Sequence, residues 1–504
     1  MSRVLGAALQ GVDGVAVEVE VRISSLLPRI DIVGLPEAAV RESAARVRAA
    51  IAAVGQRFPE RRVTVNLAPA GLRKSGAGLD LPIAVSILAA SGAVAASRLA
   101  GLGLIGELAL DGRLRPVRGA LALTLAACDA GCTRVIVPAA NGTEAALTPN
   151  LAVLTAADLG AVVAYLDGSR PLPVARVEAC PAKPERLPDL AAVRGQERAK
   201  RALEVAAAGG HGVLLRGAPG CGKTMLARRL PSLLPSLDFP EALEVTRIHG
   251  ASGQLHEGVP IVTARPFRAP HHTASPAGLL GGGSPPRPGE VSLAHRGVLF
   301  LDELPEFDRR SLEALRQVIE QRRIVVARAR SSCVFPAHFQ FIAASNPCPC
   351  GWRGSPGRDC RCDDGAVARY AARVSGPLLD RIDLHVAMSP VAWCDLDAPG
   401  SCETSFEVRE RVVRARAVQE RRGRDRRLRT NAEIPDEAMD ALVGATPDAR
   451  RLLGRAVERL GLSARAARRV LKVARSIADL GGDAKTGPAA VAEALSYRDG
   501  AAAP

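Results

Sequence analysis

Hydrophobic and polar positions divide the chain into three units with different periodicities. In the first unit, residues 1 to 168, short apolar runs alternate with amphipathic helical patterns. VAVEVEV (15–21) alternates with period two, as a half-buried strand does, and VRESAARVRAAIAAVG (40–55) has the period of a helix. The same rules predict further strands at 63–69 and 133–138 and a buried helix at 81–92.

A proline-rich segment follows the first unit. SRPLPVARVEACPAKPERLP (169–188) contains five prolines, so we expect an extended, poorly packed linker. From residue 189 to about 400 strands and helices alternate again, and residues 405 to 500 have helical periodicity with no convincing strand. In the second unit core strands are predicted at 213–217, 297–303 and 339–346, and weaker, hairpin-like strands at 262–266 and 324–328. The expected fold class is α/β with a helical C-terminal unit.

The composition indicates a class of binding partner and a cellular compartment. The net charge of +15 favours an anionic partner, most often nucleic acid. Codon bias explains why only six of the 67 basic residues are lysine, but not the excess over acids. The start of the chain lacks an apolar run long enough for a signal peptide, and no stretch approaches the roughly 20 apolar residues of a membrane span. We therefore expect a cytoplasmic protein that is not bound to a membrane, with its 11 cysteines as thiols or metal ligands.

One motif predicts a phosphate-binding loop. GAPGCGKT (217–224) fits G-x-x-x-x-G-K-[ST], follows a predicted strand and precedes a predicted helix. Its glycines let backbone N–H groups face phosphate oxygens, its lysine places a positive charge on the β and γ phosphates, and its threonine hydroxyl binds Mg²⁺. The expected ATP-binding residues are Gly217, Gly220, Gly222, Lys223 and Thr224.

Two later strands end in polar side chains that complete such a site. GVLFLDE (297–303) ends in Asp302, expected in the Mg²⁺ shell, and Glu303, expected to polarise the attacking water. FQFIAASN (339–346) ends in Asn346, which could hold that water or the γ-phosphate. The alternatives are a strand-end charge pair and a common Asn-Pro strand exit.

Two arginines are candidates for stabilising the transferred phosphate. Arg381 precedes a predicted strand and suits an arginine finger that reaches a neighbour's ATP; the alternative is a surface salt bridge to a nearby aspartate. Arg465, near the start of an amphipathic helix in the third unit, could contact the nucleotide from the lid, and Arg468 and Arg469 compete for that role.

Four cysteines form a separate pattern, C-x-C-x9-C-x-C, in a loop rich in Gly, Pro and Asp. Four thiols in a loop without a hydrophobic core predict a structural Zn²⁺ that orders it. The spacing within each pair is tighter than the usual C-x2-C, and the alternative is a loop of free thiols. The candidate ligands are Cys348, Cys350, Cys360 and Cys362.

At this point the chain resembles a known family. The segments 265–303 and 345–351 (SNPCPCG) closely resemble magnesium-chelatase-like AAA+ proteins of the ComM/YifB type. The resemblance implies a P-loop AAA+ core, an insertion around 265–296, a β-hairpin at about 322–336, a helical lid and a homo-hexameric ring. It maps the nucleotide residues of the family onto Lys223, Thr224, Asp302, Glu303, Asn346, Arg381 and Arg465.

The family also implies a function and a partner. ComM-type proteins act in natural transformation as ring helicases that drive branch migration while single-stranded DNA is integrated. In related rings the two insertions point into the pore. On that analogy, His271, His272, Arg328 and Arg330 are candidates for contacts with DNA or a neighbouring subunit; packing within the insertion and a solvated hairpin are the alternatives.

The first unit resembles the Lon-type protease domain in segments 65–85 and 106–141. Gly78 aligns with the Lon serine nucleophile and Leu123 with the lysine base, and the nearby Lys74 with its neighbouring serine does not reproduce the dyad. Without nucleophile and base there is no hydrolysis. We therefore expect a catalytically dead binding or assembly module.

The basic segment 409–429 holds ten arginines against three acids. It predicts either DNA binding or a solvated lid helix with pairs such as Glu410 with Arg414. With little aromatic interleaving, tracking of the DNA backbone by charge fits better than base stacking.

The leading hypothesis is a hexameric AAA+ motor that moves on single-stranded or branched DNA. The alternatives are a chelatase-like motor subunit, an ATP-dependent protease and a factor that remodels proteins. The Lon-like unit argues against the chelatase, because chelatase motor subunits lack one, and the missing dyad argues against the protease.

Overall fold

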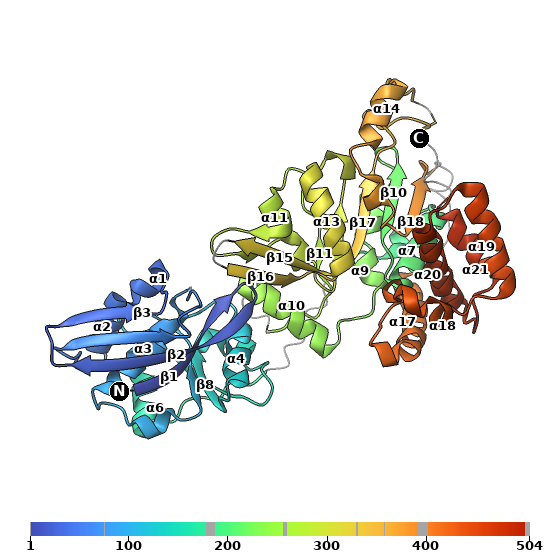
Figure 1. Cartoon of the computed structure of the whole chain (residues 1–504). Helices are drawn as coiled ribbons and strands as arrows, with labels where there is room; N and C mark the ends of the chain where they lie inside the picture. Colours follow the sequence, from blue (N-terminus) through green and yellow to red (C-terminus); the bar gives the residue numbers. More distant parts are fainter. Residues whose placement is uncertain are drawn as a thin grey trace.

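The computed structural model arranges the chain as a row of three parts, from the N-terminal unit through a central core to a helical lid (Figure 1). It describes residues 2–74, 76–177, 187–255, 260–328, 331–356, 358–391 and 402–498. None of the helices in these ranges has the length and apolarity needed to cross a membrane.

The N-terminal unit is built on a seven-stranded mixed sheet with the order β3-β4-β2-β1-β5-β8-β9. The strands predicted from period-two patterns are present as β2, β4 and β8, and the buried helix as α3, in which nine of 11 residues are buried. Strand β1, not predicted, pairs antiparallel with β2 along its whole length. The strands are β1 Ser2–Gln10, β2 Asp13–Ser24, β3 Arg29–Val33, β4 Arg62–Ala68, β5 Leu102–Leu104, β6 Glu107–Leu108, β7 Leu114–Arg115, β8 Arg134–Pro138 and β9 Ala152–Ala156. The helices are α1 Ala38–Arg41, α2 Ser43–Ala53, α3 Asp80–Ala90, α4 Ala120–Asp129, α5 Gly142–Ala145 and α6 Leu159–Asp167.

The start of the proline-rich segment differs from the expectation. It is extended, but it is not poorly packed: Leu172 is 8% exposed, and Ala175 N–H donates to the carbonyl of Val153 in β9. The apolar residues between the prolines therefore extend the N-terminal unit along its edge strand. Residues 178–186 lie outside the described ranges.

The central core is a five-stranded sheet in the order β11-β14-β17-β10-β18, and every neighbouring pair is parallel. The three predicted core strands are confirmed as β10, β14 and β17. The strand expected at 262–266 is wrong: the edge strand β11 begins at Phe267, because Pro266 has no N–H to donate to a ladder. The strands are β10 Val213–Gly217, β11 Phe267–Arg268, β12 Gly281–Gly282, β13 Arg287–Pro288, β14 Val298–Leu301, β15 Arg323–Arg328, β16 Ser331–Pro336, β17 Gln340–Ser345 and β18 Leu384–Met388. The helices are α7 Glu197–Gly209, α8 Lys223–Ala227, α9 Leu230–Leu233, α10 Phe239–Ser252, α11 Pro276–Leu280, α12 Glu290–Leu293, α13 Arg309–Gln321, α14 Asp364–Ala371 and α15 Gly376–Leu379.

The N-terminal unit contacts the core through α10 and the β15–β16 hairpin. Helix α4 packs on α10, and Arg247 on α10 pairs with Asp13 at 3.1 Å. At the turn between β1 and β2, Val12 is fully buried in one hydrophobic cluster with Phe335 of the hairpin. The N-terminal unit is thus joined to a core element that the sequence identified as an insertion.

The lid is helical, as predicted, and joins the core through a buried polar network. Its helices are α17 Ser405–Arg422, α18 Met439–Val443, α19 Pro447–Leu460, α20 Ala464–Gly481 and α21 Pro488–Ser496. At the core edge His211 is fully buried between Asp383, at 3.0 Å, and Ser476 of α20, at 2.8 Å. Arg469 of α20 also donates to Asp383, at 2.5 Å. Burial alone would raise the pKa of Asp383, but Arg469 and His211 outweigh burial and hold it well below its usual range.

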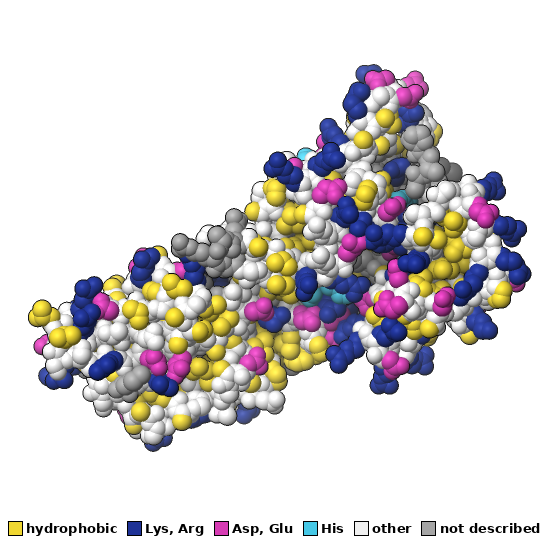
Figure 2. Space-filling view, in the orientation of Figure 1, with side chains coloured by type: hydrophobic (Ala, Val, Ile, Leu, Met, Phe, Trp, Pro, Cys, Tyr) yellow, Lys and Arg dark blue, Asp and Glu magenta, His cyan; other side chains and the backbone are white. Residues whose placement is uncertain are grey.

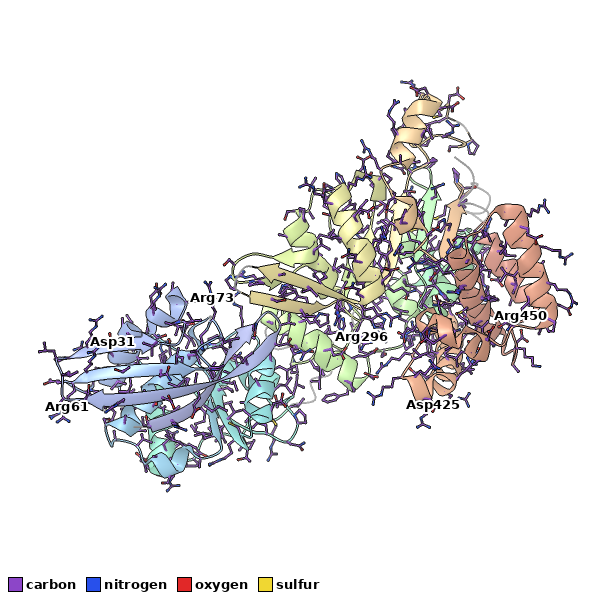
Figure 3. All side chains as sticks on the ribbon, in the orientation of Figure 1. Asp31, Arg61, Arg73, Arg296, Asp425 and Arg450 are labelled. Carbon is purple, nitrogen blue, oxygen red and sulfur yellow. The ribbon has the colours of Figure 1, made fainter. Side chains whose placement is uncertain are left out.

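Arg411 and Arg429 of the 409–429 segment belong to this junction, and Arg422 forms an ion pair within the lid. Arg411 pairs with Glu204 at 2.5 Å, Arg422 with Asp479 at 2.6 Å, and Arg429 with Glu241 at 2.8 Å. Figure 2 shows basic, acidic and histidine side chains gathered where the lid meets the core, and Figure 3 places Arg296 at this junction, with Arg450 on the outer side of the lid. Part of the basic excess is therefore used inside the chain.

The junction predicts a large loss of stability when Asp383 is replaced. Asp383→Ala leaves Arg469 without its carboxylate in a mostly buried place, which costs about 3–5 kcal/mol. Asp436→Ala removes an ion pair with Arg468 that is more than half exposed, so it should change stability little. Urea unfolding midpoints of the two variants, compared with the parent chain, test this. Equal shifts would contradict the network's role.

Candidate nucleotide-binding site

The phosphate-binding motif lies at the carboxyl end of β10 and leads into α8. Gly220 and Gly222 have φ of +80° and +93°, a region that favours glycine, so these two provide the turn, as expected. Gly217 has a different reason: a Cβ there would lie 2.5 Å from the carbonyl oxygen of Met388 in β18. Two glycines therefore shape the loop and the third allows two strands to approach closely.

Lys223 and Asn346 meet directly. The lysine Nζ donates to the carbonyls of Gly217 (2.6 Å) and Ala218 (2.9 Å) and to Asn346 Oδ1 (3.0 Å). Burial lowers the pKa of Lys223, and the nearby Asp302 and Glu303 oppose that effect. The lysine is thus held over its own loop by oxygen atoms that phosphate oxygens can replace.

Thr224 and Asp302 are brought together from different elements. The Thr224 hydroxyl, in the first turn of α8, donates to Asp302 Oδ2 at 2.6 Å, just past the end of β14. A hydroxyl and a carboxylate beside a phosphate loop are oxygen donors of the kind that Mg²⁺ takes, with substrate phosphates filling other positions. These two residues fit the magnesium site that the sequence predicted.

Glu303 contacts His272, a residue for which the sequence predicted a different contact. Its backbone is left-handed, with φ +53°, and its carboxylate Oε2 lies 3.4 Å from Nδ1 of His272. The His272 ring lies 4.1 Å from the His271 ring between centroids, with the two planes tilted by 34°, and it meets Phe307 edge-on. The sequence identified His272 as a candidate for contact with DNA or a subunit. The contact with Glu303 could have been inferred only from the position of His272 shortly after the edge strand β11, which pairs with β14. The insertion therefore touches the expected catalytic carboxylate.

Arg381 and Arg465 lie together, away from the phosphate loop. Arg381 pairs with Glu320 of α13 at 2.7 Å, and Arg465 of α20 pairs with the same carboxylate. Arg381 precedes β18, whose start is hydrogen-bonded to Gly212 at the amino end of β10. Because β10 and β18 are parallel, these arginines sit at the edge of the sheet opposite the phosphate loop, roughly 16 Å away along five residues of strand.

The three lid arginines differ in the partners that their side chains have. Arg468 pairs with Asp436, and Arg469 is held by Asp383 in the lid junction. Arg469 also donates to the backbone carbonyl of Arg381, at 2.8 Å, but Arg465 is the one of the three whose guanidinium shares the Glu320 carboxylate with Arg381. In this conformation Arg465 does not reach the phosphate loop of its own chain.

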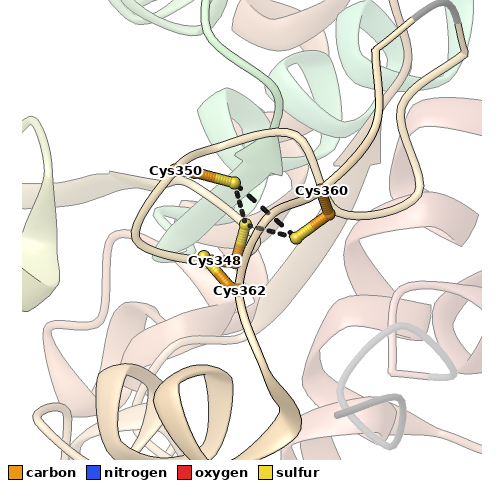
Figure 4. A group of neighbouring side chains, drawn as sticks. All are labelled: Cys348, Cys350, Cys360 and Cys362. Atoms are coloured by element: carbon orange, nitrogen blue, oxygen red, sulfur yellow. Dashed lines mark hydrogen bonds between the residues drawn. The ribbon is translucent and has the colours of Figure 1, made fainter.

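The four loop cysteines converge after β17 (Figure 4). Their Sγ atoms all lie within 4.8 Å of one another.

In the N-terminal unit, the positions that align with the Lon dyad carry no nucleophile and no base: Gly78 has no side chain, and Leu123 is buried in an apolar cluster. The side chains of Arg328 and Arg330 lie outside the described residues.

Comparison with known proteins finds matches along most of the chain. Three family models match: "Magnesium chelatase, subunit ChlI" at residues 189–396, "Subunit ChlI of Mg-chelatase" at 19–141 and "Magnesium chelatase, subunit ChlI C-terminal" at 402–498. "Competence protein ComM" of Haemophilus influenzae is 42% identical over 98% of this chain and 97% of its own length.

The chain belongs to the ComM/YifB-type family of magnesium-chelatase-like AAA+ proteins. Escherichia coli YifB, itself uncharacterized, is 43% identical over 97% of this chain and 96% of its own length. An uncharacterized protein of Mycobacterium tuberculosis is 45% identical over 99% and 98%. The similarity to ComM/YifB proteins includes the N-terminal unit as well as the core and lid.

The contact between His272 and Glu303 predicts a change in ATP turnover. If the histidine restrains the carboxylate, His272→Ala frees Glu303 to orient water, and the basal ATPase rate rises by up to about fivefold, the worth of one exposed ion pair. Thr273→Ala is the matched control, because it lies in the same segment, keeps both histidine rings and removes a side chain that bonds to His271 and not to His272. Steady-state ATPase assays with both variants decide; equal rates in the two would contradict the restraint.

Proposed function

We propose that the protein is an ATP-driven ring motor on DNA, a branch-migration helicase that helps to integrate single-stranded DNA during transformation or recombination. Membership of a family with a relative named for competence supports the biological setting. The meeting of Lys223 with Asn346, and of Thr224 with Asp302, supports the ATP site, and it is the single observation that carries the proposal.

In the proposed reaction each residue has a separate task. Lys223 binds the β and γ phosphates after exchanging its carbonyl partners for phosphate oxygens. Thr224 and Asp302 would hold Mg²⁺, which would supply positive charge to neutralise the charge that develops on the phosphates. Glu303 orients the attacking water, and Asn346 keeps Lys223 and the γ-phosphate in register.

The positions of the phosphate loop and the two arginines at opposite edges of the sheet support a ring. The phosphate loop is at one edge and the pair Arg381 and Arg465 at the other, so one chain cannot bring them together. In a head-to-tail ring, one edge of each subunit faces the opposite edge of the next. We propose that both arginines complete the neighbour's site, and that the ring is a homo-hexamer, as the family resemblance implies.

Single-stranded or branched DNA is the proposed track. The net charge of +15 favours a polyanion. The β15–β16 hairpin and the insertion with His271 and His272 are the candidate contact elements. Because His272 touches Glu303, movement of the insertion on DNA has a direct route to the hydrolytic site. A protein-remodelling factor would use the same motor on a different polymer.

The proposal predicts ATP hydrolysis that DNA stimulates. We expect the parent chain to hydrolyse ATP with Mg²⁺ and the rate to rise with single-stranded or branched DNA, while Lys223→Ala abolishes both rates by removing the phosphate-binding charge. Asp436→Ala, which alters an exposed pair far from these residues' contacts, is a control for substitution itself. Basal ATPase without DNA binding at low salt would reject the DNA motor and favour a protein substrate.

A further inference from the structure

The loop after Asn346 has almost no apolar interior. Among the described residues from 347 to 363, only Cys348 and Gly351 are buried. Several loop side chains instead make polar or cation–π contacts: Arg353 pairs with Asp364 at 2.8 Å, and Arg358 lies over the ring of Trp352 at 4.5 Å. A loop of this length without a core needs another source of order.

The four cysteines at its centre have the geometry of one small ion. Cys348 Sγ lies 3.4 Å from Cys350 Sγ and 3.6 Å from Cys360 Sγ, and Cys350 Sγ lies 3.6 Å from Cys360 Sγ. A tetrahedral Zn²⁺ with Zn–S bonds of 2.3 Å places its sulfurs roughly 3.8 Å apart, close to these values. The distances are far longer than the roughly 2.05 Å of a disulfide. The backbone N–H of Arg353 points at Cys348 Sγ at 3.4 Å, a donor that stabilises thiolate charge.

This cluster is attached to the nucleotide site at two points. Cys348 follows Asn346 by two residues, and Asn346 accepts a hydrogen bond from Lys223. Gly351, with φ +83°, packs so closely on Pro219 of the phosphate loop that a Cβ there would lie 2.7 Å from the proline ring. The loop therefore supports both the phosphate loop and the asparagine that contacts its lysine.

We propose that Cys348, Cys350, Cys360 and Cys362 bind one structural Zn²⁺ that orders this loop and thereby positions Asn346 and the phosphate loop for ATP. On binding, the four thiols release their protons to solvent and the thiolates coordinate the ion. The zinc site is closed by four protein ligands, so it contributes order and not chemistry. The link to ATP rests on the proposed function; the metal site itself does not.

The first test counts metal in the full-length chain. Purified without added zinc or chelator, it should contain about one zinc per chain by elemental analysis, and Co²⁺ exchanged into it should give the absorption of a tetrahedral thiolate site. The double variant Cys360→Ser, Cys362→Ser should lose the zinc. Cys128→Ser is the matched control, because Cys128 is a half-buried thiol in the N-terminal unit, near the carbonyl of Pro149. A parent chain without zinc or the cobalt spectrum, or a double variant that keeps its zinc, would overturn the site.

The second test measures the dissociation constant of a fluorescent ATP analogue. We expect roughly tenfold weaker binding in the double variant, comparable to losing one charge-assisted hydrogen bond at Lys223. Gly351→Ala should also weaken binding while it keeps the zinc, so it reports on the contact with Pro219 without touching a ligand. Unchanged binding in both variants would overturn the coupling. A parent chain that binds zinc but not ATP would instead contradict the proposed function.

Discussion

The common direction of five strands is the constraint on which the functional arrangement depends. Since β11, β14, β17, β10 and β18 are all parallel, their carboxyl ends meet at one edge of the sheet. The phosphate loop, Asp302, Glu303 and Asn346 follow β10, β14 and β17, so chain direction alone gathers them. The same constraint sends Arg381, which precedes β18, to the opposite edge. A site that needs both edges needs two chains.

The residues at the carboxyl ends of β10, β14 and β17 could be identified from the sequence because each belongs to a local pattern. A glycine-rich turn between a strand and a helix, and apolar strands that end in carboxylates or an amide, can be recognised within ten residues. The contact of His272 with Glu303 and the sharing of Glu320 by Arg381 and Arg465 could not be predicted in this way. They depend on packing between segments that are far apart in the chain.

The role of the arginine-rich segment 409–429 was the other feature that the sequence alone could not establish. The arginine-rich segment looked like a DNA surface or a solvated helix, yet Arg411, Arg422 and Arg429 pair with acids of the core or lid. A hydrophobic cluster shared by the core and the lid, together with buried polar groups such as His211 and Asp383, fixes the lid on the core. Arg465 on the lid is therefore held in a definite position beside Arg381. Likewise, only the fold shows that the N-terminal unit contacts the hairpin insertion through Val12.

If the ATP site is shared between neighbouring chains, two inactive variants should complement each other when they are mixed. Lys223→Ala removes the phosphate-binding lysine, and Arg381→Ala removes the arginine at the opposite edge. In an equal mixture, about a quarter of head-to-tail interfaces pair an intact phosphate loop with an intact arginine. A shared site predicts that ATPase activity returns to roughly that fraction of the parent rate after the variants are mixed and reassembled. Two inactive variants whose mixture remains inactive, although they assemble together, would contradict it.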